Sequence, residues 1–287
     1  MNSIIQLFNY QFFTNAIIAA IFTSISCGIV GTWVVAKRNV FISGGITHAS
    51  FGGIGIAYFL GLNPILGAIV FACATALGIE FVSRRTEVRE DSVIAILWSL
   101  GMALGIIFIF LTPGYTPNLM SYLFGSILSV STVDIVMATS IAGVVILFFS
   151  LFYKPILFIA FDEEYARTHK LPIQPIKYIL VILVALTIVL NIRVVGIILV
   201  LSLLTIPQTI ANLFTKSFKN IMFISIFTGF IGSVGGILVA YWLDIPPGAS
   251  IIFLLVTIFI FVKIIKTILF SIALKRNISN QYISPNE

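Results

Sequence analysis

The chain has 287 residues, of which 60% are hydrophobic and only 9% are charged. About a quarter of the residues of a soluble protein are charged, so this composition excludes a soluble enzyme, and its wealth of apolar residues excludes a disordered chain. The formal net charge of +6 does not by itself indicate nucleic-acid binding, because Lys and Arg also orient membrane proteins. With a mean hydropathy of +1.16, the chain is predicted to cross a membrane several times.

Long apolar segments follow one another along the whole chain. Each is close to the ~20 residues that a helix needs to cross a bilayer, and such segments favour a helical bundle over a β-barrel. The predicted segments are residues 12–36, 43–60, 64–82, 92–111, 133–153, 176–190, 196–213, 220–242 and 249–272. The sixth is short, because only about 15 residues lie between its flanking charges, so eight segments remain an alternative to nine. We predict an all-α transmembrane bundle, a single domain over residues 1–287 without a soluble domain.

The basic residues gather on one side of the membrane if the segments alternate in direction. All but one of the 16 Lys and Arg residues then fall on that side, and Arg193 lies opposite. The positive-inside rule makes the basic side cytoplasmic, with the N-terminus outside and the C-terminus inside. The basic bias thus predicts a multi-pass protein of the cytoplasmic (inner) membrane, surrounded by lipid, with no nucleic-acid partner.

The second segment contains an ionisable residue near the middle of the membrane. His48 lies ten residues beyond Arg38, which is about 15 Å along a helix and half of a ~30 Å hydrocarbon layer. A histidine at this depth indicates function, because it is costly unless it faces a cavity or a partner; the alternative is a neutral ring bonded to a backbone carbonyl. Ser43 and Thr47 add hydroxyl groups. The five glycines between residues 44 and 55 fit either close helix packing or a broken helix.

Acidic residues near the ends of other segments have structural interpretations. Glu80 precedes Arg84 by four residues, so the two can form an ion pair on one helix face. Asp91 and Asp134 begin the fourth and fifth segments, where an acidic residue stabilises a helix N-terminus. Helix capping is therefore the predicted role of both aspartates.

Residues 161–172 predict a short helix on the cytoplasmic face. Three acidic residues occupy its first turn and basic residues its last turn before Pro172, the order that the helix dipole favours. His169 falls in this last turn, so we do not assign it as a metal ligand. An ordinary solvated loop helix without a partner has the same pattern.

Several catalytic motifs are missing from the sequence. It contains no Gly-x-x-x-x-Gly-Lys-Ser/Thr loop for ATP and no His-Glu-x-x-His for a membrane metalloprotease. A serine nucleophile would need a separate base, and the second histidine, His169, is predicted outside the membrane. We therefore predict that the chain is not an enzyme and that any ATP is hydrolysed by a partner.

Five short motifs, taken in order, carry a family resemblance. They are Arg38–Gly53 with Thr47 and His48, Glu90–Ser92, Tyr122–Leu128, Val195–Pro207, and Asp244–Ala249. Together they resemble the permease subunits of the zinc/manganese/iron type of ABC transporters, from about Ala16 to Ile265. The resemblance implies a homodimer that works with two cytoplasmic ATPase subunits and an extracytoplasmic solute-binding protein that delivers the metal ion. It implies no tightly bound cofactor, only the transported divalent ion and ATP on the partner.

The resemblance also assigns residues to roles. It makes residues 161–171 a coupling helix, with Asp162, Glu163, Glu164, Tyr165 and Arg167 contacting the ATPase. The family's metal passage is associated with an aspartate and, four residues later, a histidine. His48 matches the histidine, whereas Gly44 stands at the aspartate position.

This departure leads to a specific hypothesis. His48 from both subunits lines a shared pathway, and Ser43 or Thr47 with water completes a transient metal site. Loss of the carboxylate favours zinc or iron over manganese, because carboxylate-rich sites suit manganese. A permease for a metal chelate such as a siderophore or corrinoid is the alternative, followed by a secondary transporter driven by an ion gradient.

Overall fold

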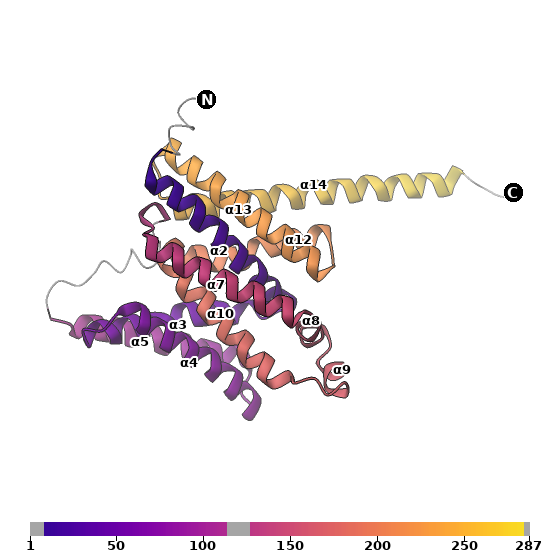
Figure 1. Ribbon diagram of the computed structural model, residues 1–287. Coiled ribbons are helices and arrows are strands. Elements are labelled where there is room, and N and C mark those ends of the chain that lie inside the picture. The colour runs from indigo at the N-terminus through magenta and orange to yellow at the C-terminus, as the bar shows by residue number, and fades with distance from the viewer. Residues whose placement is uncertain (1–8, 114–126, 284–287) are drawn as a thin grey trace.

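The computed structural model describes residues 9–113 and 127–283, and every regular element within these ranges is a helix (Figure 1). The elements are α2 (Gln11–Ala36), α3 (Val40–Phe59), α4 (Pro64–Arg85), α5 (Glu90–Leu111), η1 (Ile127–Ser129), α7 (Thr132–Leu151), α8 (Tyr153–Phe161), α9 (Glu163–Thr168), α10 (Ile173–Val195), α11 (Ile197–Leu203), α12 (Ile206–Phe214), α13 (Phe218–Leu243) and α14 (Pro247–Ile283). Over the described ranges, nine segments are long and apolar enough to cross a membrane, which confirms the predicted all-α bundle.

The sixth segment is a full-length helix, which favours nine segments over eight. α10 has 23 residues, because Lys177 and Arg193 lie inside the helix and do not end it. Both charges have acidic partners: Lys177 contacts Glu163 and Arg193 contacts Asp134. Paired charges near the ends of a membrane helix are less costly than unpaired ones. The predicted segment was too short because it was ended at each charge.

The seventh segment is present but is broken in the middle, a feature that the sequence did not predict. α11 ends at Leu203 and α12 begins at Ile206, with Pro207 in the first turn of α12, where its missing N–H costs no hydrogen bond. The buried side chain of Gln208 donates from Nε2 to the carbonyl oxygens of Leu203 (3.1 Å) and Cys27 (3.0 Å). An interruption inside a membrane requires such replacement hydrogen bonds, because lipid offers none.

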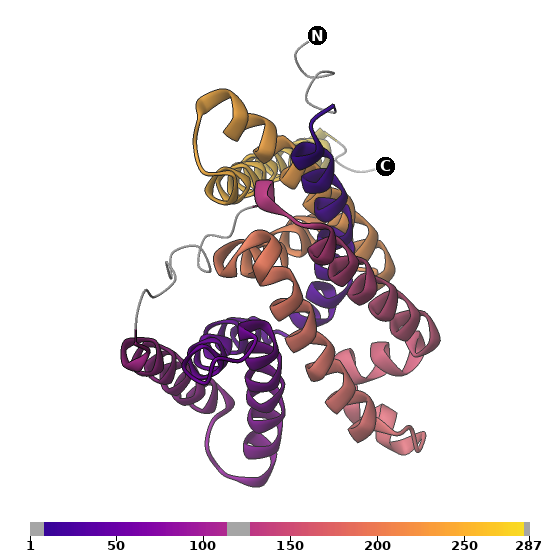
Figure 2. The same ribbon diagram turned by 60° about the vertical axis from the view of Figure 1, so that its left-hand side comes forward.

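The helices α3, α4 and α5 form one group at the side of the bundle, and α10 packs against α4 and α3 (Figures 1 and 2). α2 contacts both α7 and α13, and α14 packs along α13 before its C-terminal part extends away from the other helices (Figure 1). The basic ends meet on one side: Lys37 at the end of α2 reaches Glu163 of α9. We call this the basic side; Arg193, at the end of α10, lies on the opposite side.

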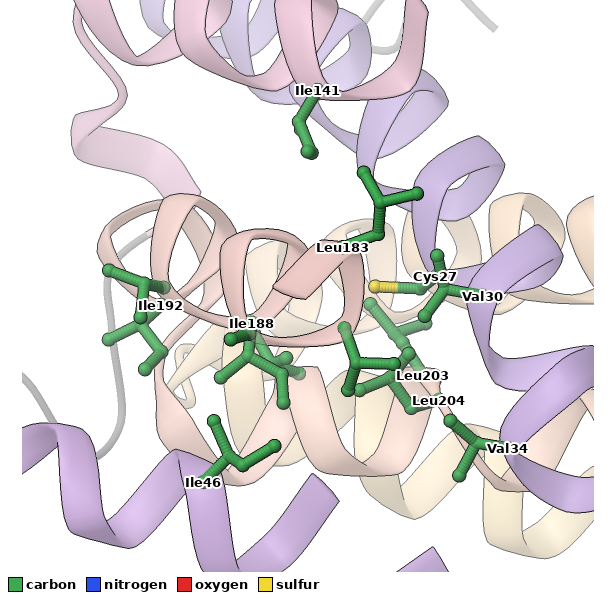
Figure 3. Close-up of a cluster of buried hydrophobic side chains, with 14 of the residues drawn as sticks. Cys27, Val30, Val34, Ile46, Ile141, Leu183, Ile188, Ile192, Leu203 and Leu204 are labelled. Atoms are coloured by element: carbon green, nitrogen blue, oxygen red, sulfur yellow. The ribbon is translucent and has the colours of Figure 1, made fainter. Parts of the chain in front are cut away.

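The core lies where α2, α10 and α11 meet, with α3 and α7 contributing from either side. Figure 3 shows buried aliphatic side chains of these helices pointing toward one another, among them Val30, Ile46, Leu183 and Leu203. Burial of apolar groups within the protein gives close packing but little hydrophobic gain in lipid, so polar contacts matter more. Asn191 of α10 provides one, since it accepts a hydrogen bond from Thr23 of α2 at 2.7 Å.

The glycines of α3 serve close packing and do not break the helix. A Cβ atom at Gly52 would lie 2.7 Å from the carbonyl oxygen of Gly101, and one at Gly55 would lie 2.7 Å from Cα of Gly105, both on α5. Gly53 meets Gly67 of α4 in the same way. α3 is continuous from Val40 to Phe59, so of the two interpretations of these glycines, close packing is confirmed.

Candidate functional site

His48 lies near the middle of α3, on the face that meets α5. Its ring stacks on the indole ring of Trp98, with centroids 4.3 Å apart and an angle of 4° between the planes. The ring is half-buried, and within the described residues its buried Nδ1 atom has no hydrogen-bond partner. Neutral imidazole binds a metal through a ring nitrogen, and no hydrogen bond within the described residues occupies Nδ1 of this ring.

Gly44 lies one turn before His48 on the same face of α3. A Cβ atom at Gly44 would lie 3.8 Å from Trp98 and 4.0 Å from Leu201 of α11, which are ordinary contacts. A Cβ atom is thus tolerated at this position, unlike at the glycines packed against α4 and α5. The surface beside His48 is formed by α3, α5 and α11.

The hydroxyl groups predicted as helpers lie elsewhere on the helix. Ser43 and Thr47 are fully buried, and each donates to a carbonyl of its own helix, Ser43 to Val40 (2.7 Å) and Thr47 to Ser43 (2.5 Å). Since the helix turns 3.6 residues per turn, neither residue shares the face of Gly44 and His48. Within the described residues, no three His, Cys, Asp or Glu side chains gather in a group that could hold a metal ion.

Sequence reasoning did not find Trp98 or Leu201 as neighbours of His48. Both lie in other apolar segments, and neither has a local pattern that distinguishes it from a lipid-facing residue. Only the packing of α5 and α11 on α3 brings them to the ring.

The predicted cytoplasmic helix exists but is shorter than expected. α9 covers Glu163–Thr168 instead of residues 161–171, because Phe161 still belongs to α8. Asp162 is the N-cap, accepting a hydrogen bond from the N–H of Tyr165 at 2.9 Å. Glu164, Tyr165 and Arg167 are exposed. His169 ends the helix and packs on Tyr165, as predicted for a residue of the last turn.

Glu163 is the only predicted α9 site residue that is partly buried, and it is the centre of an ion-pair network on the basic side. Its carboxylate lies 2.7 Å from Nζ of Lys177 and 3.5 Å from Nζ of Lys37, and it also accepts from Arg167 at 3.1 Å. Burial alone would raise the pKa of Glu163, but these hydrogen bonds and charges outweigh burial and lower the pKa to about 2. The carboxylate is therefore ionised at neutral pH.

The network extends from α9 into the bundle through Glu80. Lys177 also lies 3.9 Å from Glu80 of α4, and Arg84 lies 3.7 Å from the same carboxylate, which confirms the predicted Glu80 and Arg84 pair. Through shared ion pairs, α9 is linked to α2, α10 and α4. The sequence indicated the pair within α4 but not the connection to α9, which joins distant parts of the chain.

The opposite side has an ion pair that the sequence did not predict. Arg193 lies 2.8 Å from the buried carboxylate of Asp134 on α7. Asp134 also forms a capping box with Ser131, as predicted for an acidic residue at a helix start. Asp91 lies in the first turn of α5, as predicted, and pairs with Arg89 at 3.5 Å, but the N-cap residue is Arg89 and no side chain of the described residues caps this helix.

The described residues contain nine helical segments long and apolar enough to cross a membrane, with a histidine midway along one of them and a charged short helix on one face. These features define a class, the membrane-spanning transport proteins. Residues 9–266 match the ABC 3 transport family, so the chain belongs to this family. It is 41% identical, over 82% of each chain, to a probable metal transport system membrane protein of Chlamydia pneumoniae. It is 35% identical to the manganese transport system membrane protein MntC of Halalkalibacterium halodurans, over 88% of this chain and 87% of the relative.

A solved structure has a similar fold. PsaBC from Streptococcus pneumoniae, solved in complex with Fab, matches with a TM-score of 0.80 and 30% sequence identity, over 90% of this chain and 95% of that one. The chain is thus a multi-pass membrane permease of a metal ABC transporter, and ATP hydrolysis occurs in a separate subunit. The motif Tyr122–Leu128 lies mostly outside the described residues.

Proposed function

We propose that this chain forms the translocation pathway of an importer for a divalent transition-metal ion, and that His48 binds the ion in transit. The observation that supports this most strongly is the half-buried ring at mid-membrane with an Nδ1 atom that lacks a hydrogen bond. A polar group left unpaired at that depth is costly unless a ligand uses it.

One imidazole ligand per chain is suited to a site that binds an ion weakly and releases it, and less suited to a site that holds an ion tightly. A closed zinc site has four protein ligands, whereas a conduit must bind weakly enough to release its ion. In a homodimer, two His48 rings with water or hydroxyl oxygens would give a transient site. The participation of Ser43 and Thr47 stays a prediction. Both hydroxyl groups are buried and donate to carbonyl oxygens of their own helix.

Two arguments about the identity of the transported metal point in different directions. Manganese is the ion in the name of the Halalkalibacterium halodurans relative, and it is the first substrate to test. The glycine at position 44 removes a carboxylate from the face of His48, which favours zinc or iron. Transport of a chelate is the alternative, and it predicts that loss of His48 has little effect.

We further propose that α9 couples the pathway to an ATPase on the cytoplasmic face, with the N-terminus outside and the C-terminus inside. The positions of the basic residues support this orientation. Glu164, Tyr165 and Arg167 are exposed, so a partner could contact them, whereas Asp162 and Glu163 hold α9 in place. An extracytoplasmic solute-binding protein would deliver the ion to the opposite side.

The variant His48→Ala tests the pathway in the assembled transporter. We expect uptake of zinc, manganese and iron to be abolished while the complex with the ATPase still forms. Ser50→Ala is the matched control, because it removes a buried polar group from the same helix and should leave uptake intact. Normal uptake by His48→Ala would refute the role of His48.

The variant Gly44→Asp tests the argument about the metal, because a Cβ atom at Gly44 makes only ordinary contacts. We expect relative uptake to shift toward manganese and away from zinc. The same zinc-to-manganese ratio as in the parent chain would remove the argument from Gly44.

A further inference from the structure

An apolar groove lies between α2, α7 and α13, on helices that contribute none of the residues around His48. Its volume is about 510 Å³. Its apolar walls are formed by Ile25, Ile29, Ile146, Phe149, Met222, Phe223 and Ile226. Two of these, Phe223 and Ile146, are 58% and 47% exposed, so the groove opens toward the hydrocarbon layer.

α2 and α13 are in close contact at Ile226, which also lines the groove. A Cβ atom at Gly28 would lie 2.5 Å from Cγ1 of Ile226, so the two helices are in contact there. From Ile226 to Lys219, at the basic end of α13, the distance is seven residues, or about 10 Å. The groove therefore runs from the basic side about one third of the way through a ~30 Å hydrocarbon layer.

The basic end of the groove carries positive charge without a matching carboxylate. Lys219 and Tyr153 line this end, and Tyr153 also lines a second hollow with Lys216. Neither lysine has a carboxylate within 4.0 Å in the described part of the chain, whereas Lys37 and Lys177 both pair with Glu163. Asp162 lines the second hollow too, but its carboxylate caps α9.

The start of α13 adds to this positive potential. Its first turn contains no acidic residue, and the N-cap residue Ser217 makes no side-chain capping bond. The first N–H groups of a helix have no partner within the helix and favour an anion nearby.

We propose that this groove binds an anionic phospholipid from the leaflet on the basic side. One acyl chain would lie along the apolar walls, and the phosphate group would meet Lys219 and Lys216 at the headgroup level. Basic pockets between membrane helices on the cytoplasmic side bind anionic headgroups, and the long side chain of lysine reaches the interface from a buried backbone. The pattern of an apolar groove ending in unpaired cations fits this ligand.

A second copy of the chain fits the groove less well. In a twofold-symmetric contact the same patch of both chains takes part, so the interface would cover two Lys219 ammonium groups that have no carboxylate partner within the described residues of their own chains. A soluble partner cannot reach walls that lie in the hydrocarbon layer. Charge and position therefore favour a lipid.

The test counts bound lipid on the full-length chain. The protein is placed in phosphatidylcholine nanodiscs with increasing phosphatidylglycerol, and native mass spectrometry measures the retained phosphatidylglycerol. We expect Lys219→Gln to weaken retention about fivefold, the size expected for one lysine at an anionic surface, and Lys219→Arg to retain the lipid. Lys263→Gln on α14 is the matched control and should behave as the parent chain.

A second variant leaves the charges unchanged and fills the groove. Ile146→Trp places a large side chain at the mouth, and we expect it to lower retention while α2, α7 and α13 stay packed. A photo-reactive residue at Phe223 should label phosphatidylglycerol. Equal retention by the parent chain, Lys219→Gln and Ile146→Trp would overturn the proposal. Labelling of a second copy of the chain would overturn it too and would make the groove a contact between copies.

Discussion

Two regions of this bundle are held together by opposite means. Inside the membrane, α3 packs on α4 and α5 through glycines that let backbones touch, as at Gly53 against Gly67. On the basic side, α9 is joined to α2 and α10 through the charges of Glu163, Lys37 and Lys177. The difference shows that the kind of helix contact depends on its depth in the membrane. Charges are costly in the hydrocarbon layer, so helices there are held together by close packing of small residues.

The two regions also differ in what they can tolerate. A close contact between glycines cannot accommodate a larger residue, because any added atom would overlap with backbone atoms of the neighbouring helix. An ion-pair network with several partners can lose one member and retain the others. If this comparison holds, substitutions at the packed glycines should cost most, and loss of one charge on the basic side should cost less.

The largest effect on stability is expected at the packed glycines. Gly55→Ala places a Cβ atom 2.7 Å from Cα of Gly105, so α3 and α5 must separate. We expect a loss of about 3 kcal/mol in the free energy of unfolding, the upper range for overpacking. The control is Gly143→Ala on α7, where nothing lies within 4 Å. Unfolding in bicelles measures both, and equal losses would break the comparison.

A smaller loss is expected for the ion pair on the opposite side. Arg193→Gln leaves the carboxylate of Asp134 buried without its cation, and we expect a loss of about 2 kcal/mol, below the value for a fully buried pair because Arg193 is partly exposed. A double-mutant cycle with Asp134→Asn measures the pair itself. Strictly additive losses would show that the two residues do not interact.

A loss of about 1 kcal/mol is expected for Glu163→Gln, because three cations share this partly exposed carboxylate. Its pKa of about 2 lies below the ~4.3 of an unfolded glutamate. A lowered pKa stabilises the fold fully above pH 4.3, and this stabilisation is lost as the pH falls toward 2. The difference in unfolding free energy between the parent chain and Glu163→Gln should be constant from pH 5 to 8 and vanish in acid. A difference that changes between pH 6 and 8 would contradict this assignment.

The smallest effect is expected at Gly44. Gly44→Ala adds a Cβ atom that makes only ordinary contacts with Trp98 and Leu201, and alanine favours a helix by up to about 1 kcal/mol over glycine. Stability should be unchanged or slightly higher. A loss as large as that of Gly55→Ala would show that Gly44 is packed as tightly as the glycines that touch α4 and α5.

Much of the fold could be predicted from the sequence because charge and apolar length report directly on the membrane. The segments, the short helix near residues 163–168 and the capping role of Asp134 all followed from local patterns. The sequence did not reveal features that depend on a contact with a residue far away in the chain. Arg193 ended the predicted sixth segment, although its pair with Asp134 lets the helix continue, and the break at Leu204 and Thr205 is supported by Gln208 and the carbonyl of Cys27.

The sequence by itself determined the class of the protein, the grouping of its basic residues and the position of His48 midway along its apolar segment, because these depend on composition and on distance along the chain. Tertiary structure alone decided that the ring of His48 stacks on Trp98, that Gly44 lies at ordinary contact distance from Trp98 and Leu201, and that Glu163 and Lys177 together link α9 to α2, α10 and α4. The physical reason is that each of these is a contact between segments that lie tens of residues apart. The hydrophobicity of a segment does not indicate which other helix its apolar face will contact.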